Sequence, residues 1–133
     1  MKNHFLIFIF SALIIFTAIS CKKKYTCTLK NQCTTIELFT VENISGANDT
    51  VKQTGNTYCR INYNTDADYN TDIVNNQNYV KAITNVSLSA QGIVVTSQYF
   101  NNVVVAQPDD VESAKGSSDK SSHESRGFTC VEQ

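Results

Sequence analysis

The chain has 133 residues, a formal net charge of −1, five cysteines, one proline and no tryptophan. This length suits one domain, because single domains most often contain about 100–150 residues. The near balance of acidic and basic residues argues against a nucleic-acid-binding protein, which would carry a basic face, so no nucleic-acid partner is expected.

An apolar run near the N-terminus is typical of an export signal. After Lys2, residues 5–19 are apolar except for one Ser and one Thr. The run is shorter than the roughly 20 residues that span a bilayer core. We therefore predict that residues 1–20 are a signal peptide that is removed. An uncleaved apolar anchor and a secretory peptide cut elsewhere are the alternatives.

The residues around Cys21 resemble the lipobox of bacterial lipoproteins. Ala18-Ile19-Ser20 precedes this cysteine and Lys22–Lys24 follows it; the family pattern favours Leu where Ala18 stands. The resemblance implies that Cys21 becomes the lipidated, palmitate-carrying N-terminus of the mature chain. The start is also similar to that of small Bacteroidota lipoproteins of unassigned function, a resemblance that implies no activity.

The same resemblance implies a location in the cell envelope. No Asp follows Cys21, which in Gram-negative lipoproteins favours the outer membrane, with the domain facing the periplasm or the cell surface. Several acyl chains on one cysteine hold a domain stably at a membrane. Residues 21–24 then form a lipidated basic tether, in which each lysine near acidic headgroups contributes about 1 kcal/mol. Residues 25–133 form the single domain.

Four further cysteines point to two disulfides, because an even number in a small exported domain indicates a disulfide framework. They are Cys27, Cys33, Cys59 and Cys130. Three pairings are possible. An aromatic-Thr-Cys pattern at both ends of the domain suggests that the first and last strands are neighbours, which favours Cys27–Cys130 and Cys33–Cys59. Metal or redox use is less favoured, because the spacing differs from that of zinc knuckles.

Strand patterns dominate the first half of the domain. Residues 25–29 and 34–41 alternate in the manner of strands, and residues 43–48 contain the turn pair Ser-Gly. Shorter strands are expected at 50–54 and 57–63.

The second half of the domain is predicted to be a loop followed by a meander. Residues 64–78 are polar and indicate a long surface loop, whereas residues 81–107 indicate antiparallel strands with a tight hairpin turn at Asn101-Asn102. Proline and acidic residues at 108–112 are typical of a helix start. A last strand is expected at 127–132.

These patterns predict a mainly β domain, or a β-rich α+β domain. We expect a small antiparallel sheet with two disulfides and room for one short C-terminal helix.

Oxygen-bearing side chains alternate at the start of the predicted loop, as in an EF-hand calcium site. They belong to Asp66, Asp68, Asn70 and Asp72. The sixth position is Thr71 instead of Gly and the twelfth is Gln77 instead of Glu, so a solvated acidic loop is the simpler interpretation. Calcium is kept as a weak alternative, and no other cofactor is predicted.

A modification motif lies in the first half of the domain. Asp49-Thr50-Val51 resembles the Asp-Ser/Thr-aliphatic acceptor of Bacteroidota protein O-glycosylation, which implies a glycan on Thr50.

Catalytic groups are hard to assemble from this sequence, so a non-enzymatic role is predicted. A nucleophile needs an oriented base, whereas His123 lies in a Ser-rich segment where an exposed side chain is expected. We predict a lipid-anchored envelope protein that binds a protein or glycan partner or has a structural role. The alternatives are an inhibitor or immunity lipoprotein that plugs an envelope-active enzyme with residues 64–78, and a hydrolase that uses the acidic residues of that segment.

Overall fold

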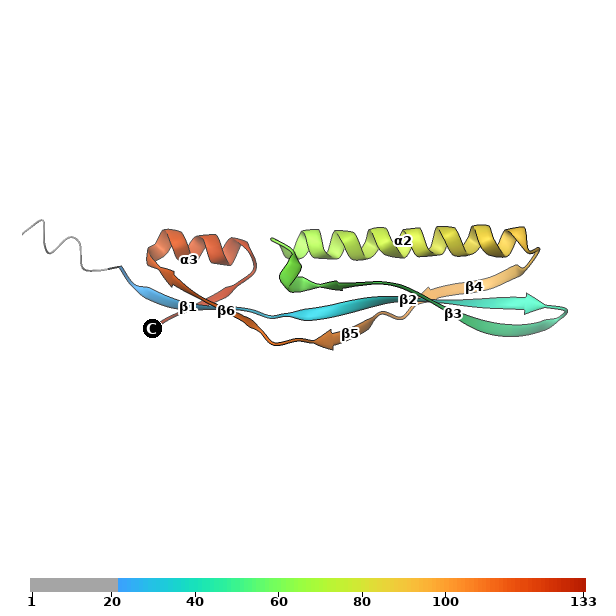
Figure 1. Cartoon of the computed structure of the whole chain (residues 1–133), viewed down its shortest axis with the longest axis horizontal. Coiled ribbons are helices and arrows are strands. Elements are labelled where there is room, and N and C mark those ends of the chain that lie inside the picture. The colour runs from blue at the N-terminus through green and yellow to red at the C-terminus, as the bar shows by residue number, and fades with distance from the viewer. Residues whose placement is uncertain (1–21) are drawn as a thin grey trace, which may run out of the picture.

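The computed structural model describes residues 22–133, so the predicted signal peptide and Cys21 lie outside the described residues. Two antiparallel sheets follow one another along the length of the molecule, and each carries one helix on the same side (Figure 1). The prediction of a β-rich domain with two disulfides is confirmed. Among residues 22–133, no helix is both long and apolar enough to cross a membrane.

The sheet nearer the N-terminus, here called the small sheet, has three strands in the order β6-β1-β7. Its elements are β1 (Lys24–Leu29), β6 (Asp110–Lys115), α3 (Gly116–Ser125) and β7 (Thr129–Glu132). Alternate residues of β1 face α3, and Cys27, Leu29, Ala114 and Phe128 form the core between them. Cys27 lies opposite Cys130 in the β1–β7 ladder and is bonded to it.

The other sheet, here called the large sheet, is centred on a 13-residue strand, β2. Its strands are β2 (Gln32–Ile44), β3 (Ala47–Cys59), β4 (Val94–Phe100) and β5 (Val103–Ala106). Every second residue of β2 from Thr34 to Glu42 is buried, as the two-residue period of a strand requires when a helix covers one face. The predicted turn is confirmed between β2 and β3, where Ser45 and Gly46 both adopt positive φ. The second disulfide, Cys33–Cys59, also joins these strands.

The prediction of a loop over residues 64–78 is wrong, because these residues begin the 25-residue helix α2 (Asp66–Ala90). A short 3₁₀ helix, η1 (Arg60–Asn62), leads into it. Thr65 caps α2 by accepting a hydrogen bond from the Asp68 backbone N–H at 3.1 Å. Acidic residues then occupy the first turn, where the helix dipole favours them.

The first strand of the predicted meander is also wrong, because residues 81–90 are the last turns of α2. The helix packs on the large sheet through Tyr69, Asn76, Val80 and Leu88, which share one helical face. Two of these four carry polar groups, which weakened the helical hydrophobic signal. The phenolic oxygen of Tyr69 lies 2.5 Å from the hydroxyl of buried Thr34, so this contact includes a hydrogen bond.

Helix α2 approaches β3 most closely at Gly55. A Cβ atom at this position would lie 2.7 Å from the Asn76 side-chain oxygen and 2.8 Å from a Val80 methyl group. The same Asn76 oxygen accepts a hydrogen bond from the backbone N–H of Asn56 at 3.0 Å. The ladder between β2 and β3 shifts its register here, so the amide of Asn76 satisfies a donor that the irregularity leaves free.

Asn101 and Asn102 do not form the predicted hairpin turn. Both β4 and β5 pair with β2, at Leu38–Asn43 and Gln32–Thr35 respectively. The two asparagines therefore lie between two strands that follow one another along β2.

The predicted helix start at 108–112 is wrong as well. Residues 110–115 form strand β6, which pairs along all of β1, and α3 begins only at Gly116, whose φ is +82°. Pairing with β1 overrides the local helix signal of the proline and acidic residues. The short C-terminal helix itself is present.

Arg60 joins the two sheets at their junction. Its side chain is only 4% exposed. It is ion-paired with Asp66 and donates to the backbone oxygens of Tyr63 at 2.8 Å and Arg126 at 2.6 Å. Because Arg60 follows β3 and Arg126 precedes β7, this one guanidinium ties the large sheet to the small one.

Candidate binding site

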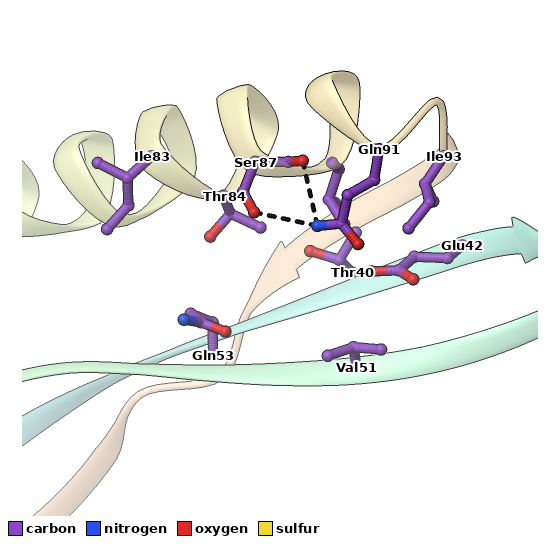
Figure 2. Close-up of a pocket in the computed structure, with 10 residues that line it drawn as sticks. Thr40, Glu42, Val51, Gln53, Ile83, Thr84, Ser87, Gln91 and Ile93 are labelled. Carbon is purple, nitrogen blue, oxygen red and sulfur yellow. Dashed lines mark hydrogen bonds between the residues drawn. The ribbon is translucent and has the colours of Figure 1, made fainter.

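A pocket of about 420 Å³ lies between the C-terminal half of α2 and the large sheet. Figure 2 shows its floor, formed by strands β2 and β3, and its roof, formed by the last turns of α2. The helix side chains over it include Thr84 and Ser87, which are too small to fill the space. The close contact at Gly55 is therefore followed by an opening toward the end of the helix.

Glu42 is the charged residue of the floor. It is 5% exposed and is the last buried residue of the alternating series in β2. Within residues 22–133, no group donates a hydrogen bond to its carboxylate and no cation pairs with it. Buried charges in proteins are normally paired, because removing them from water is costly. The Glu42 oxygens are not sealed from solvent, because the Thr84 hydroxyl is the one fully buried unpartnered side-chain atom among residues 22–133. They open onto the pocket, where a ligand can pair with them.

A second acid increases the negative charge beside Glu42. Asp49 lies directly opposite Glu42 in the β2–β3 ladder, so the two side chains share one face of the sheet. Like charges opposite each other are destabilising in a sheet. The lysine of the same strand, Lys52, lies on the other face, where it pairs with Glu37 at 2.9 Å.

The polar groups of the roof and floor are hydroxyls, amides and one carboxylate, and the amide of Gln53 on the floor can donate as well as accept. The Thr84 hydroxyl is buried and has no hydrogen-bond partner among the described residues. The amide nitrogen of Gln91 donates to the Ser87 carbonyl and hydroxyl, both at 3.2 Å, so its oxygen is left to face the pocket (Figure 2). Thr40 accepts a hydrogen bond from the amide nitrogen of Gln98 at 3.2 Å.

Apolar side chains complete the lining: Val51 from β3, Ile83 and Leu88 from α2, and Ile93 before β4. The pocket thus combines apolar walls with a few polar groups, the usual composition of small-molecule sites. Its hydroxyl groups have no histidine or lysine beside them in the lining that could activate them. The arrangement can bind a ligand that supplies hydrogen-bond donors.

The predicted calcium residues lie in α2 and are engaged in helix contacts. Asp66 pairs with Arg60, and Asp68 accepts a hydrogen bond from the Thr65 hydroxyl at 2.8 Å. Asn70 is exposed on the helix surface. No cluster of three or more His, Cys, Asp or Glu residues suited to a metal ion occurs within residues 22–133. Calcium binding stays an untested prediction, and the calcium-loop geometry on which it rested is absent.

The fourth of these residues, Asp72, accepts a hydrogen bond from the Tyr63 hydroxyl at 2.9 Å. Burial of the phenol and this bond to Asp72 together raise the pKa of Tyr63 to about 12.

The predicted glycosylation residue lies away from the pocket. Thr50 is exposed in β3 and lies opposite Val41, on the sheet face that α2 does not cover. Its modification stays a prediction.

The cysteines are paired as the sequence favoured, with Cys27 bonded to Cys130 and Cys33 bonded to Cys59. Neither disulfide lines the pocket.

His123 is buried, so the prediction of an exposed histidine is wrong. Its Nδ1 lies 2.8 Å from the Asp119 carbonyl and its Nε2 lies 2.8 Å from a Glu112 carboxylate oxygen. The Asp119 carbonyl, together with Glu112, holds the pKa of His123 above its usual value of 6.5, against the opposing effect of burial. The ring also packs edge-on against Phe128. These contacts make His123 part of the packing between α3 and the small sheet.

Sequence reasoning overlooked Glu42, although one signal for it was present. It continues the inward-facing series of β2, Ile36, Leu38 and Thr40, at the same two-residue spacing. An acid in phase with a buried face is unusual and could have been singled out.

Comparison with protein-family models, with curated proteins and with solved structures finds no match to this chain.

Proposed function

We propose that this chain is a lipid-anchored protein of the Gram-negative cell envelope that works as a non-enzymatic binding module. Its ligand site is the pocket between α2 and the large sheet. The observation that carries the binding role is Glu42, a buried residue whose carboxylate has no partner among residues 22–133 and lines an open pocket. A bound ligand that donates to this carboxylate would supply the partner that residues 22–133 do not provide.

The shape of the molecule supports presentation of this pocket away from a membrane. The chain enters β1 at Lys24, directly after the proposed lipidated residue and its lysines. Strand β1 and the C-terminal end of α2 lie toward opposite ends of the long axis (Figure 1). An anchor at Cys21 therefore leaves the small sheet next to the membrane and the pocket at the far end.

The inhibitor and hydrolase hypotheses assumed an acidic surface loop, which residues 66–78 do not form because they are part of α2. The inhibitor hypothesis used residues 64–78 as a protruding loop, and the chain from Asp66 onward is helix α2, which packs on the large sheet. The hydrolase hypothesis used Asp66, Asp68 and Asp72, which are held by Arg60, Thr65 and Tyr63.

Two measurements on the protein in its native host test the proposal. Metabolic labelling with a palmitate analogue should mark the wild-type chain, and Cys21→Ala should abolish both the label and the recovery in the membrane fraction. An unlabelled wild-type chain would contradict the anchor. A small-molecule screen by NMR should then give saturable shifts at Thr84 and Gln91, while shifts confined to the small sheet would contradict the proposed site.

A further inference from the structure

We infer that the ligand of the α2 pocket carries a primary ammonium group on a short aliphatic stem, and that Glu42 is its counter-ion. This inference rests on the proposed binding function and specifies the chemical class of the ligand.

The carboxylate of Glu42 favours a ligand that donates hydrogen bonds, and Gln53 of the floor adds an amide with both a donor and an acceptor. Floor and roof both present acceptors, namely the Glu42 carboxylate below and the Gln91 amide oxygen above (Figure 2). The Thr84 hydroxyl, which can donate or accept, is a further buried group without a partner among residues 22–133. Meanwhile the amide donors of Gln91 and Gln98 are taken by Ser87, Asn85 and Thr40. An ammonium group offers three donors and no acceptor, which matches the Glu42 carboxylate and the Gln91 oxygen.

The charge of the pocket favours a cation. Glu42 and Asp49 sit side by side on the face below α2. No described Lys, Arg or His residue forms an ion pair with either of them. The nearby Lys52 is held by Glu37 on the opposite face, so it does not neutralise them. A cationic ligand would relieve both the burial cost of Glu42 and its repulsion from Asp49.

The size and walls of the pocket favour a small organic cation over a metal ion. The lining holds one carboxylate, and even with the neighbouring Asp49 and a few neutral oxygens the site falls short of the six to eight oxygen ligands that calcium takes. The volume of about 420 Å³ lies in the lower part of the range for small-molecule sites. Val51, Ile83 and Ile93 provide apolar surface for an aliphatic stem. Both a free small amine and the side chain of a lysine have this chemistry.

Binding to matched probes tests the inference. The full chain from its native host, purified in a non-ionic detergent, is titrated with n-pentylammonium chloride and with 1-pentanol, which has the same stem without the charge. We expect saturable binding of pentylammonium and at least tenfold weaker binding of pentanol. Glu42→Gln should weaken pentylammonium binding about tenfold to hundredfold, as loss of a charge-assisted hydrogen bond does. Glu37→Gln, on the same strand but the opposite face, should leave binding unchanged.

The source of the ammonium group is resolved by a second pair of probes. Nα-acetyl-lysine methylamide that binds more tightly than pentylammonium, with its norleucine counterpart failing to bind, identifies a lysine side chain as the ligand. The reverse ranking identifies a free amine.

Two results would overturn the inference, and they differ in what they say about the proposed function. Equal binding of pentanol and pentylammonium, unaffected by Glu42→Gln, would show a ligand pocket that does not select an ammonium group. Absence of binding by every probe, combined with no small-molecule shifts at Thr84 or Gln91, would remove the pocket as a ligand site as well.

Discussion

The two sheets differ at one buried polar side chain each, His123 against the small sheet and Glu42 in the large sheet. Beneath α3, both ring nitrogens of His123 have oxygen partners, and Glu112 also has Arg126 at 3.5 Å. Beneath α2, Glu42 has no partner among residues 22–133 and lies opposite another acid. A fully satisfied polar cluster stabilises a structure, whereas a half-satisfied one costs free energy. The buried histidine against the small sheet is therefore part of a paired cluster that stabilises the fold. The large sheet instead places a carboxylate without a partner among residues 22–133 beside an open pocket.

Removal of the disulfides should have the largest effect on the unfolding free energy, and the size of the effect should differ between the two sheets. In the chain-entropy model, the loop closed by Cys27–Cys130 stabilises by about 4.7 kcal/mol and the shorter Cys33–Cys59 loop by about 3.5 kcal/mol. We expect the paired Cys→Ser variants to lose unfolding free energy in this order. Urea unfolding measures both losses of unfolding free energy. A greater loss on removal of Cys33–Cys59 would contradict the predicted order.

Replacing Arg60 should come next, because it removes the link between the sheets. Arg60→Met leaves the Tyr63 and Arg126 carbonyls without their donor, and we expect a loss of about 3 kcal/mol of unfolding free energy. Arg126→Met removes a half-exposed guanidinium and should cost under about 1 kcal/mol. If the two variants have equal stability in urea, Arg60 does not join the sheets.

A smaller loss is expected from Gly55→Ala, which tests the contact that holds α2 in place. The added methyl group meets Asn76 and Val80, and overpacking of this kind costs about 1–3 kcal/mol. Thr54→Ala, at the exposed neighbouring position, is the control and should change stability by less than about 0.5 kcal/mol. Thermal unfolding of both variants gives the comparison, and an unchanged midpoint for Gly55→Ala would mean that α2 does not lie so close.

The smallest effect is a pH dependence that belongs to the small sheet. Because the pKa of His123 is raised in the folded protein, its stabilising contribution is complete below the unfolded value of about 6.5 and is lost as the pH rises through the folded value. Unfolding free energy should therefore fall as the pH rises above about 6.5. His123→Gln should flatten this slope, and a slope that survives the substitution would assign it to other groups.

The parts of the fold that were predictable are those fixed by local pattern. Residues 25–29 and 127–132 show strand alternation around their cysteines, and the turn at Ser45-Gly46 has its own signature. Each of these features is encoded within a few neighbouring residues. The disulfide pairing followed from the same repeated pattern.

The parts that were missed depend on contacts between distant segments. Val80, Ala82, Val86, Leu88 and Ala90 share one two-residue phase, interrupted by Thr84, which fits a strand. Only packing against β2 and β3 selects the helix. Strand β6 is likewise fixed by its ladder with β1. Glu42 lines a pocket only because α2 lies over it. The pocket was not predicted because the helix was not predicted.

The unfolding free energy of Glu42→Gln, measured by urea with and without saturating n-pentylammonium, tests the central claim most directly. Without ligand, loss of the unpaired charge should make the variant more stable than the wild-type protein by about 1 kcal/mol. With ligand, only the wild-type protein should gain stability, because ligands stabilise the state that binds them. A variant that is less stable without ligand, or that gains as much from pentylammonium, would show that Glu42 serves the fold and not a ligand.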